Sequence, residues 1–304
     1  MHIMASDGAY LHVRDMKDGE GLPVILIHGW PLNGDMFEYQ IVALAEAGFR
    51  VITYDRRGFG RSSHTASGYH YDCFADDLAD VIEATGVEKA ALVGFSMGGG
   101  EVARYLSRHG SAKIDRVVLI SSVVPYMLKD DSNPDGVPED VFADMHDKIR
   151  TDRFDFLQSF GKSFYGVGLI SRPVSSALLD WTFQMGAMAN PKATLDCVDA
   201  FSRTDFRPDL ASFDIPTLII HGTEDATVPI EPSARAAAKG IPHATLLEYS
   251  GEAHGLFATA PDKLNDDLIS FLNGGIDLEE RRRRLEEDIY EAGGPFMGSV
   301  PLYP

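Results

Sequence analysis

Short runs of consecutive hydrophobic residues recur along the chain, separated by longer stretches with a helical spacing of apolar residues. Continuous apolar runs, rather than alternating ones, are typical of parallel strands that helices cover on both faces. One intervening stretch, residues 72–85, places Phe74, Leu78 and Ile82 on a single helical face. The pattern predicts an α/β protein with a mostly parallel central sheet. The predicted strands are residues 24–27, 50–54, 90–93, 116–120, 217–220 and 245–249.

Two parts of the chain depart from this alternation. Near the amino terminus, Asp7-Gly8 predicts a two-residue hairpin turn, and therefore an antiparallel edge on the sheet. Residues 125–212 mix Gly, Pro and Asp with helical segments and many aromatic residues, which predicts a helical cap inserted between two strands. The expected organisation is a first core segment 1–124, the cap 125–212, a second core segment 213–273 and a C-terminal extension 274–304.

The composition excludes several kinds of partner. Against 46 Asp and Glu the chain has 27 Lys and Arg, a net charge of −19, and its one basic run, at positions 281–284, lies between acidic residues. Such a chain repels phosphate backbones, so we expect no nucleic acid. No stretch reaches about 18 consecutive apolar residues, so we expect no membrane span. Cys73 and Cys197 are too few and too far apart for a disulfide framework, which favours reduced thiols and a cytoplasmic location.

The strongest chemical signal is Gly94-Phe95-Ser96-Met97-Gly98, which lies between a predicted strand and a predicted helix. A G-x-S-x-G sequence in this setting is typical of a nucleophile elbow. Its glycines leave room for a sharp turn that projects the serine hydroxyl above the sheet. The start of the helix also favours a developing negative charge. Ser96 is therefore the candidate nucleophile.

A serine hydroxyl needs a base, and the base needs a group that fixes its tautomer. Asp225 follows the strand predicted at 217–220, and His254 follows the strand predicted at 245–249. Both would then lie at the same edge of the sheet as Ser96. The chain order is serine, acid, histidine, and Glu224 is the main rival for the acid.

The motifs together resemble the cofactor-free haloperoxidase and aryl esterase group of the α/β-hydrolases. The likeness extends from about residue 4 to residue 272. It rests on six segments, His28-Gly29-Trp30-Pro31, Tyr54-Asp55-Arg56-Arg57-Gly58-Phe59-Gly60-Arg61-Ser62, Gly94-Phe95-Ser96-Met97-Gly98-Gly99-Gly100, Cys197-Val198-Asp199-Ala200-Phe201, Thr204-Asp205-Phe206-Arg207-Pro208-Asp209 and Pro216-Thr217-Leu218-Ile219-Ile220-His221-Gly222.

The resemblance implies hydrolysis of small esters by a Ser96, His254 and Asp225 triad, with the backbone N–H groups of Trp30 and Met97 as oxyanion donors. It also implies that a peracid is made from a carboxylic acid and hydrogen peroxide, without metal, heme or other cofactor. We expect small-molecule substrates and a homo-oligomer. Near Trp30, the resemblance places an acyl pocket formed by Val123, Met127, Phe160, Phe164, Thr227 and Ile230.

Several alternatives stay open from the sequence. A lactonase, a lactamase or another triad-dependent hydrolase would keep the same residues, and a silent member could bind a ligand without turnover. A metal hydrolase using His28, His221 and His254 is disfavoured, because the histidines follow different strands and no H-E-x-x-H spacing occurs. We expect His28 and Arg57 to be structural.

Overall fold

A single mixed sheet organises residues 1–275, which are the residues that the computed structural model describes. Its strand order is β1-β2-β4-β3-β5-β6-β7-β8. β2 pairs antiparallel with β1 and β4, and every pairing from β4 to β8 is parallel, so the predicted sheet type and its antiparallel edge are confirmed. The strands are β1 (His2–Met4), β2 (Tyr10–Met16), β3 (Val24–Ile27), β4 (Val51–Asp55), β5 (Ala90–Phe95), β6 (Ile114–Ile120), β7 (Thr217–Gly222) and β8 (Thr245–Tyr249).

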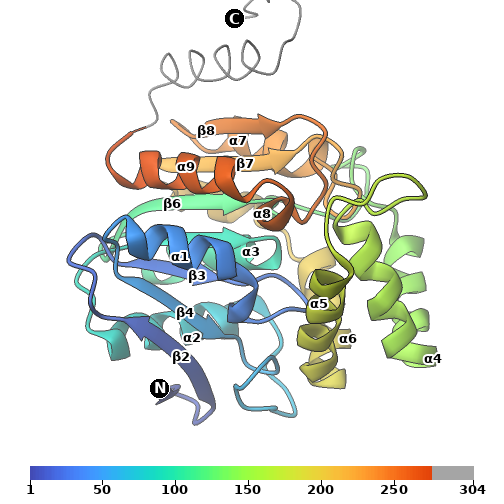
Figure 1. Ribbon diagram of the computed structural model, residues 1–304, viewed down its shortest axis with the longest axis horizontal. Coiled ribbons are helices and arrows are strands. Elements are labelled where there is room, and N and C mark those ends of the chain that lie inside the picture. Colours follow the sequence, from blue (N-terminus) through green and yellow to red (C-terminus); the bar gives the residue numbers. More distant parts are fainter. Residues whose placement is uncertain (276–304) are drawn as a thin grey trace, which may run out of the picture.

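Helices cover both faces of this sheet (Figure 1). α1 and α9 lie on one face, and α2, α3 and α7 lie on the other. The α-helices are α1 (Glu38–Glu46), α2 (Tyr71–Thr85), α3 (Met97–His109), α4 (Glu139–Phe164), α5 (Ser176–Met188), α6 (Pro191–Arg203), α7 (Ala236–Gly240), α8 (Leu256–Thr259) and α9 (Pro261–Leu272). The other helical turns are the 3-10 turns η1 (Gly34–Phe37) and η2 (Arg207–Ser212) and the π-turn η3 (Glu231–Arg235).

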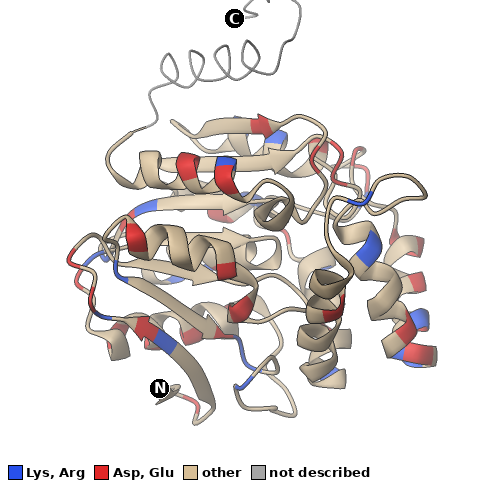
Figure 2. Ribbon diagram, in the orientation of Figure 1, with Lys and Arg blue, Asp and Glu red and all other residues tan. Residues whose placement is uncertain are grey.

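The two helical layers explain why the strands are apolar throughout. In β3, Ile25 and Ile27 pack into the hydrophobic cluster on the α2 and α3 side, whereas Val24 and Leu26 pack into the cluster on the α1 and α9 side. All four side chains are fully buried. Accordingly, β3, β5 and β7 carry no Asp, Glu, Lys or Arg, and the charges of the inner strands β4 and β6 lie near strand ends, at Asp55, Asp115 and Arg116. Helices and loops carry most of the other charges (Figure 2).

Helices α4, α5 and α6 form a separate group between β6 and β7 in the chain, within the range predicted for the cap. They lie together at the end of the sheet where the parallel strands finish (Figure 1). The long helix α4 breaks at Asp152, whose backbone is non-helical with φ −153° and ψ 93°. The Asp152 carboxylate accepts hydrogen bonds from the N–H groups of Phe154 and Asp155, and so caps the second half of α4.

Two predictions need correction or fall outside the described residues. The hairpin between β1 and β2 exists, but its predicted two-residue turn was wrong. Met4 pairs with Tyr10, and the Ala5 N–H donates to the Ala9 carbonyl, so the turn is longer. Gly8 takes the left-handed conformation, with φ 92°, near the end of this longer turn. Apart from Gly274 and Gly275, the predicted extension lies outside the described residues.

Candidate active site

Ser96 occupies a sharp turn between β5 and α3. Its φ of 53° and ψ of −118° are unusual for a residue with a side chain and cost about 1–3 kcal/mol. The turn is held by a hydrogen bond from the Ser96 N–H to the Ile120 carbonyl, at 2.8 Å. A Cβ atom at Gly94 would lie 2.7 Å from the Gly98 carbonyl oxygen, so the turn needs glycine there.

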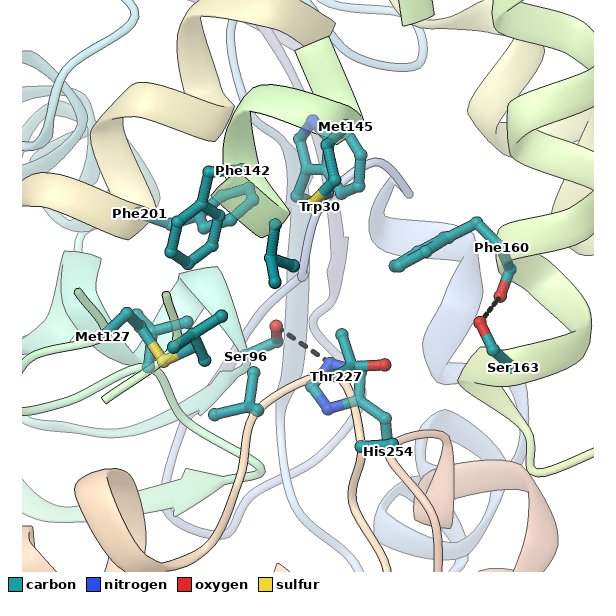
Figure 3. Close-up of a pocket in the computed structure, with 15 residues that line it drawn as sticks. Trp30, Ser96, Met127, Phe142, Met145, Phe160, Ser163, Phe201, Thr227 and His254 are labelled. Carbon is teal, nitrogen blue, oxygen red and sulfur yellow. Dashed lines mark hydrogen bonds between the residues drawn. The ribbon is translucent and has the colours of Figure 1, made fainter. Parts of the chain in front are cut away.

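Two hydrogen bonds connect Ser96 to residues from two other loops at the same edge of the sheet. Ser96 Oγ lies 3.0 Å from His254 Nε2, and His254 Nδ1 lies 2.7 Å from Asp225 Oδ2 (Figure 3 shows the first pair). An ionised carboxylate only accepts, so Nδ1 carries the proton and Nε2 accepts from the serine hydroxyl. The structure thus brings together the three residues that the sequence proposed, and all three are at most 6% exposed.

Asp225 is held from several directions. Its Oδ1 accepts hydrogen bonds from the N–H groups of Thr227 and Val228, at 2.9 and 2.8 Å. His221 Nε2 lies 3.3 Å from Oδ2 and donates to the Val228 carbonyl. Burial alone would raise the pKa of Asp225, but the neighbouring imidazoles of His254 and His221 favour the carboxylate and lower that pKa far below its ordinary value. Glu224, the rival for the acid, is exposed, and its backbone N–H donates to the Glu252 carbonyl.

Aromatic rings fix the plane of His254. The Phe95 and Phe164 ring centroids lie 5.0 and 4.8 Å from the imidazole centroid. Ser121 Oγ donates to the His254 carbonyl oxygen at 3.2 Å, which anchors the backbone as well. The imidazole is therefore aimed at Ser96 by these aromatic contacts and by the Asp225 carboxylate at Nδ1.

Two backbone N–H groups near Ser96 have no hydrogen-bond acceptor within residues 1–275: those of Trp30, which follows β3, and of Met97, the first residue of α3. Trp30 is 3% exposed and Met97 is fully buried. Buried N–H groups without a partner are rare in native proteins, and they are typical of sites that receive an anion. The Trp30 side chain is fixed separately, since its Nε1–H donates to the Thr194 carbonyl in α6.

A cavity of about 210 Å³ opens above Ser96 and His254 (Figure 3). Of the predicted pocket residues, Val123, Met127, Phe160 and Thr227 line it. Phe164 and Ile230 do not. The Phe164 ring packs against His254 and Phe257 instead, and Ile230 belongs to the hydrophobic core. The remaining lining residues, besides Trp30, Ser96 and His254, are Val137, Val141, Phe142, Met145, Ser163, Phe201, Ala226 and Val228.

The lining residues that sequence reasoning missed come mostly from the cap. On α4, Met145 follows Val141 by four residues and Phe142 by three, so the three side chains share one helical face. This spacing was visible in the sequence. Nothing in the sequence, however, indicated which face of α4 turns toward Ser96.

Comparison with known proteins identifies the family. Residues 23–261 match the family described as alpha/beta hydrolase fold. The chain belongs to the α/β-hydrolases. This hydrolase is 42% identical over 269 residues to a non-heme chloroperoxidase of Kitasatospora aureofaciens, covering 88% of this chain and 97% of that protein. It is 37% identical over 273 residues to a bifunctional esterase/perhydrolase of Acinetobacter calcoaceticus, covering 89% and 99%.

Solved structures agree with the sequence relatives. A bromoperoxidase from Bacillus anthracis superposes on the hydrolase with a TM-score of 0.86 and 45% identity, over 90% of this chain and all of that one. An esterase from Exiguobacterium antarcticum gives 0.85 and 32% identity, over 90% and 99%. The predicted resemblance to the haloperoxidase and esterase group is therefore confirmed.

The histidines considered for a metal site have other partners in the hydrolase. His28 Nε2 accepts from the Arg56 backbone N–H, and His221 Nε2 donates to the Val228 carbonyl. Among the described residues, no group of three or more His, Cys, Asp or Glu side chains is placed to hold a metal ion. Nor does any helix in this part of the chain have the length and apolar character needed to cross a membrane.

Proposed function

We propose that this α/β-hydrolase cleaves small carboxylic esters through an acyl-enzyme on Ser96, and that it passes the acyl group to water or to hydrogen peroxide. The observation that carries the proposal is the relay from Ser96 Oγ through His254 to Asp225, at 3.0 and 2.7 Å, below an apolar cavity. The relatives named as chloroperoxidase and as esterase/perhydrolase support the same chemistry.

Acylation begins when Ser96 Oγ attacks the ester carbonyl carbon and His254 Nε2 takes the hydroxyl proton. The imidazolium that forms is stabilised by Asp225, which remains ionised because its pKa is lowered. The carbonyl oxygen becomes an anion and accepts hydrogen bonds from the unpartnered N–H groups of Trp30 and Met97. The tetrahedral intermediate then collapses, and His254 returns the proton to the departing alcohol oxygen.

Deacylation uses the same groups in reverse. His254 removes a proton from water, whose oxygen attacks the acyl carbon. As the intermediate collapses, the bond from the acyl carbon to Ser96 Oγ breaks, His254 returns the proton to Oγ, and the carboxylic acid leaves. If hydrogen peroxide takes the place of water, the product is a peracid. Transfer of the terminal peroxide oxygen to a chloride or bromide ion then gives hypohalous acid and the carboxylate. Halide oxidation would thus follow from the acyl-enzyme and need no cofactor.

The cavity favours a small apolar acyl group. At about 210 Å³ it is smaller than the roughly 300–1,000 Å³ of pockets that enclose drug-sized ligands. Its lining is mainly aromatic and aliphatic, and Ser163 and Thr227 add two hydroxyl groups to that of Ser96. We therefore propose short alkyl or aryl esters as substrates.

We also propose that the hydrolase works in the cytoplasm as a homo-oligomer. Both cysteines, Cys73 and Cys197, are free thiols, which suits a reducing compartment. The oligomeric state rests on the family resemblance alone. Sedimentation analysis of the full chain tests it, and a single species of monomer mass would reject it.

The proposed function is tested by labelling with a fluorophosphonate, mass spectrometry of the modified peptide, and hydrolysis of p-nitrophenyl acetate by the same sample. We expect one adduct, on Ser96, and loss of turnover in proportion to labelling. With unlabelled protein, adding hydrogen peroxide and acetate should give peracetic acid, and the labelled protein should give none. No adduct and no turnover would reject the proposal and indicate a ligand-binding member of the family.

A further inference from the structure

Behind the oxyanion-binding amides lies a group of buried charges that the proposed mechanism does not use. Arg56 follows β4, Glu101 lies on α3, and both side chains are fully buried. Arg56 Nε donates to Glu101 Oε2 at 2.6 Å, and the Tyr54 hydroxyl donates to Glu101 Oε1. Both carboxylate oxygens therefore have partners.

The network continues from Arg56 into the segment that carries Trp30. Arg56 Nη2 donates to the His28 carbonyl at 2.8 Å, and the Arg56 backbone N–H donates to His28 Nε2 at 2.9 Å. Because Nε2 accepts, the other ring nitrogen carries the proton, and Nδ1–H donates to the Gly29 carbonyl at 2.8 Å. Burial and the nearby Arg56 hold the pKa of His28 well below its ordinary value, so the ring stays neutral and keeps this tautomer.

The bond from His28 to the Gly29 carbonyl has a direct consequence for Trp30. The Gly29 carbonyl and the Trp30 N–H belong to one planar trans peptide, in which they point in opposite directions. Holding the carbonyl oxygen therefore aims the N–H. The Leu32 N–H also donates to the Gly29 carbonyl, at 3.1 Å, which holds the same peptide from a second side.

Glu101 connects this arrangement to the second amide. It lies four residues after Met97, about one turn along α3. The two segments are also in backbone contact, since a Cβ at Gly98 would lie 2.3 Å from the Ile27 carbonyl oxygen. The ion pair therefore spans the junction between the helix that carries the Met97 N–H and the loop that carries the Trp30 N–H.

An ion pair in this place is costly for folding. Moving each charge out of water costs several kcal/mol, and apolar residues of similar size commonly stabilise a fold as well or better. Burial lowers the pKa of Arg56 to about 10, which leaves it a cation at neutral pH. Burial also raises the pKa of Glu101 well above its ordinary value, and the Arg56 guanidinium at 2.6 Å opposes that rise by favouring the ionised carboxylate. Unlike an apolar contact, the pair fixes the orientation of the two segments relative to each other, because one guanidinium donates hydrogen bonds to Glu101 and to the His28 carbonyl at once.

We propose that Arg56 and Glu101 are positioning residues that set the separation and direction of the Trp30 and Met97 N–H groups. The inference rests on the function proposed above. In the wild type, the two amides are thereby placed for the tetrahedral intermediate before any substrate arrives, so the transition state is stabilised more than the bound ester.

The test is Arg56→Lys, which keeps the charge but cannot hold Glu101 and the His28 carbonyl together. Loss of one oxyanion donor costs about 10²–10³ in kcat, so misplacement of one should lower kcat by roughly 10–100-fold with KM changed by less than about threefold. The inhibition constant of an alkyl boronic acid, which forms a tetrahedral anion on Ser96, should rise by a similar factor. Glu101→Gln should show the same pattern, and it replaces Arg56→Lys if that variant does not fold.

Arg57→Lys is the matched control. Arg57 is the next residue, and its guanidinium makes a buried, two-bond pair with Asp77 on α2. This substitution should lower the melting temperature while kcat and boronate binding stay unchanged.

Two results would overturn the proposal: Arg56→Lys with wild-type kcat and boronate binding, or equal kcat losses in the Arg56 and Arg57 variants, which would indicate general loosening. Melting temperatures and fluorophosphonate titration of active sites correct each rate for folded protein. A wild type that neither hydrolyses esters nor labels on Ser96 would instead reject the proposed function.

Discussion

The edge of the sheet and the cap above it form two sides of one cavity by different means. At the edge, Ser96, His254 and Asp225 are held by hydrogen bonds of 2.7–3.0 Å and by buried backbone contacts. The cap contributes mostly apolar side chains, such as Phe142 and Phe160 of α4. Trp30 lies where the two meet, and its ring packs against Phe160 at a centroid distance of 5.3 Å.

The two kinds of contact should respond differently to substitution. A hydrogen bond weakens steeply when its angle or length changes, whereas an apolar contact changes gradually with area. Substitutions at the edge should therefore reduce the rate for every ester. Substitutions of cap side chains that line the cavity should instead change which ester is preferred.

The largest expected effect is at the centre of the edge. Ser96→Ala removes the nucleophile and should lower kcat by about 10⁶-fold while the protein remains folded, since alanine keeps the backbone turn. Ester hydrolysis and the melting temperature of the purified variant give the two readouts. Turnover close to wild type in a folded variant would remove the serine mechanism.

Asp225 and Glu224 are neighbouring acids at the same edge, and one substitution at each compares their roles. Asp225→Asn should lower kcat/KM by about 10⁴-fold at neutral pH, because an amide no longer fixes the productive tautomer of His254. Glu224→Gln should change it by less than about twofold, because Glu224 is exposed. The reverse ranking would assign the acid to Glu224.

Phe160 and Phe164 lie one turn apart on α4, but Phe160 lines the cavity whereas Phe164 packs against His254 at the edge of the sheet, so the pair tests the division directly. Phe160→Leu enlarges the cavity and should raise the ratio of kcat/KM for hexanoate over acetate esters by about threefold to tenfold. Phe164→Leu loosens the ring against His254 and should lower kcat several-fold for both esters alike. A shift of chain-length preference in the Phe164 variant only would contradict this division.

The smallest expected effect is on stability at acid pH. The pKa of Asp225 is lowered in the folded state, so its carboxylate stabilises the fold above the ordinary value of 3.8, and this contribution is lost as the pH falls below it. Wild-type melting temperature should therefore fall more between pH 5 and pH 3 than that of Asp225→Asn. Since ~1 kcal/mol corresponds to about 2–4 °C in a larger domain, a difference of a few degrees is expected. Glu224→Gln should follow the wild type, and identical curves for all three proteins would contradict the prediction.

The sequence predicted the sheet well because its strands are buried on both faces. β3 and β8 match their predicted bounds, and β5 extends two residues beyond its predicted end, through Phe95, to reach Ser96. The hairpin turn was mispredicted because Asp7-Gly8 also suits the end of a longer turn. Local sequence does not separate the two, since pairing between β1 and β2 decides the length.

The candidate site was only partly predictable. Ser96, Asp225 and His254 each follow a recognisable strand, so their meeting follows from parallel topology. The pocket depends on how the cap packs, which no local pattern encodes. Phe164 and Ile230 were therefore placed in it wrongly, and Phe142 and Met145 were missed. The Arg56–Glu101 pair was also missed, because two charges in apolar surroundings far apart in the chain give no local signal.

The insertion point of the cap bears on how such enzymes diversify. β6 and β7, which precede and follow α4–α6, are parallel neighbours, so the excursion leaves the carboxyl end of one strand and returns to the amino end of the next. Lengthening such a closed excursion costs little extra entropy, because the cost grows only with the logarithm of its length. Insertions, deletions or grafts between these strands can therefore alter the substrate range of a descendant while its inherited reaction stays on the unchanged sheet.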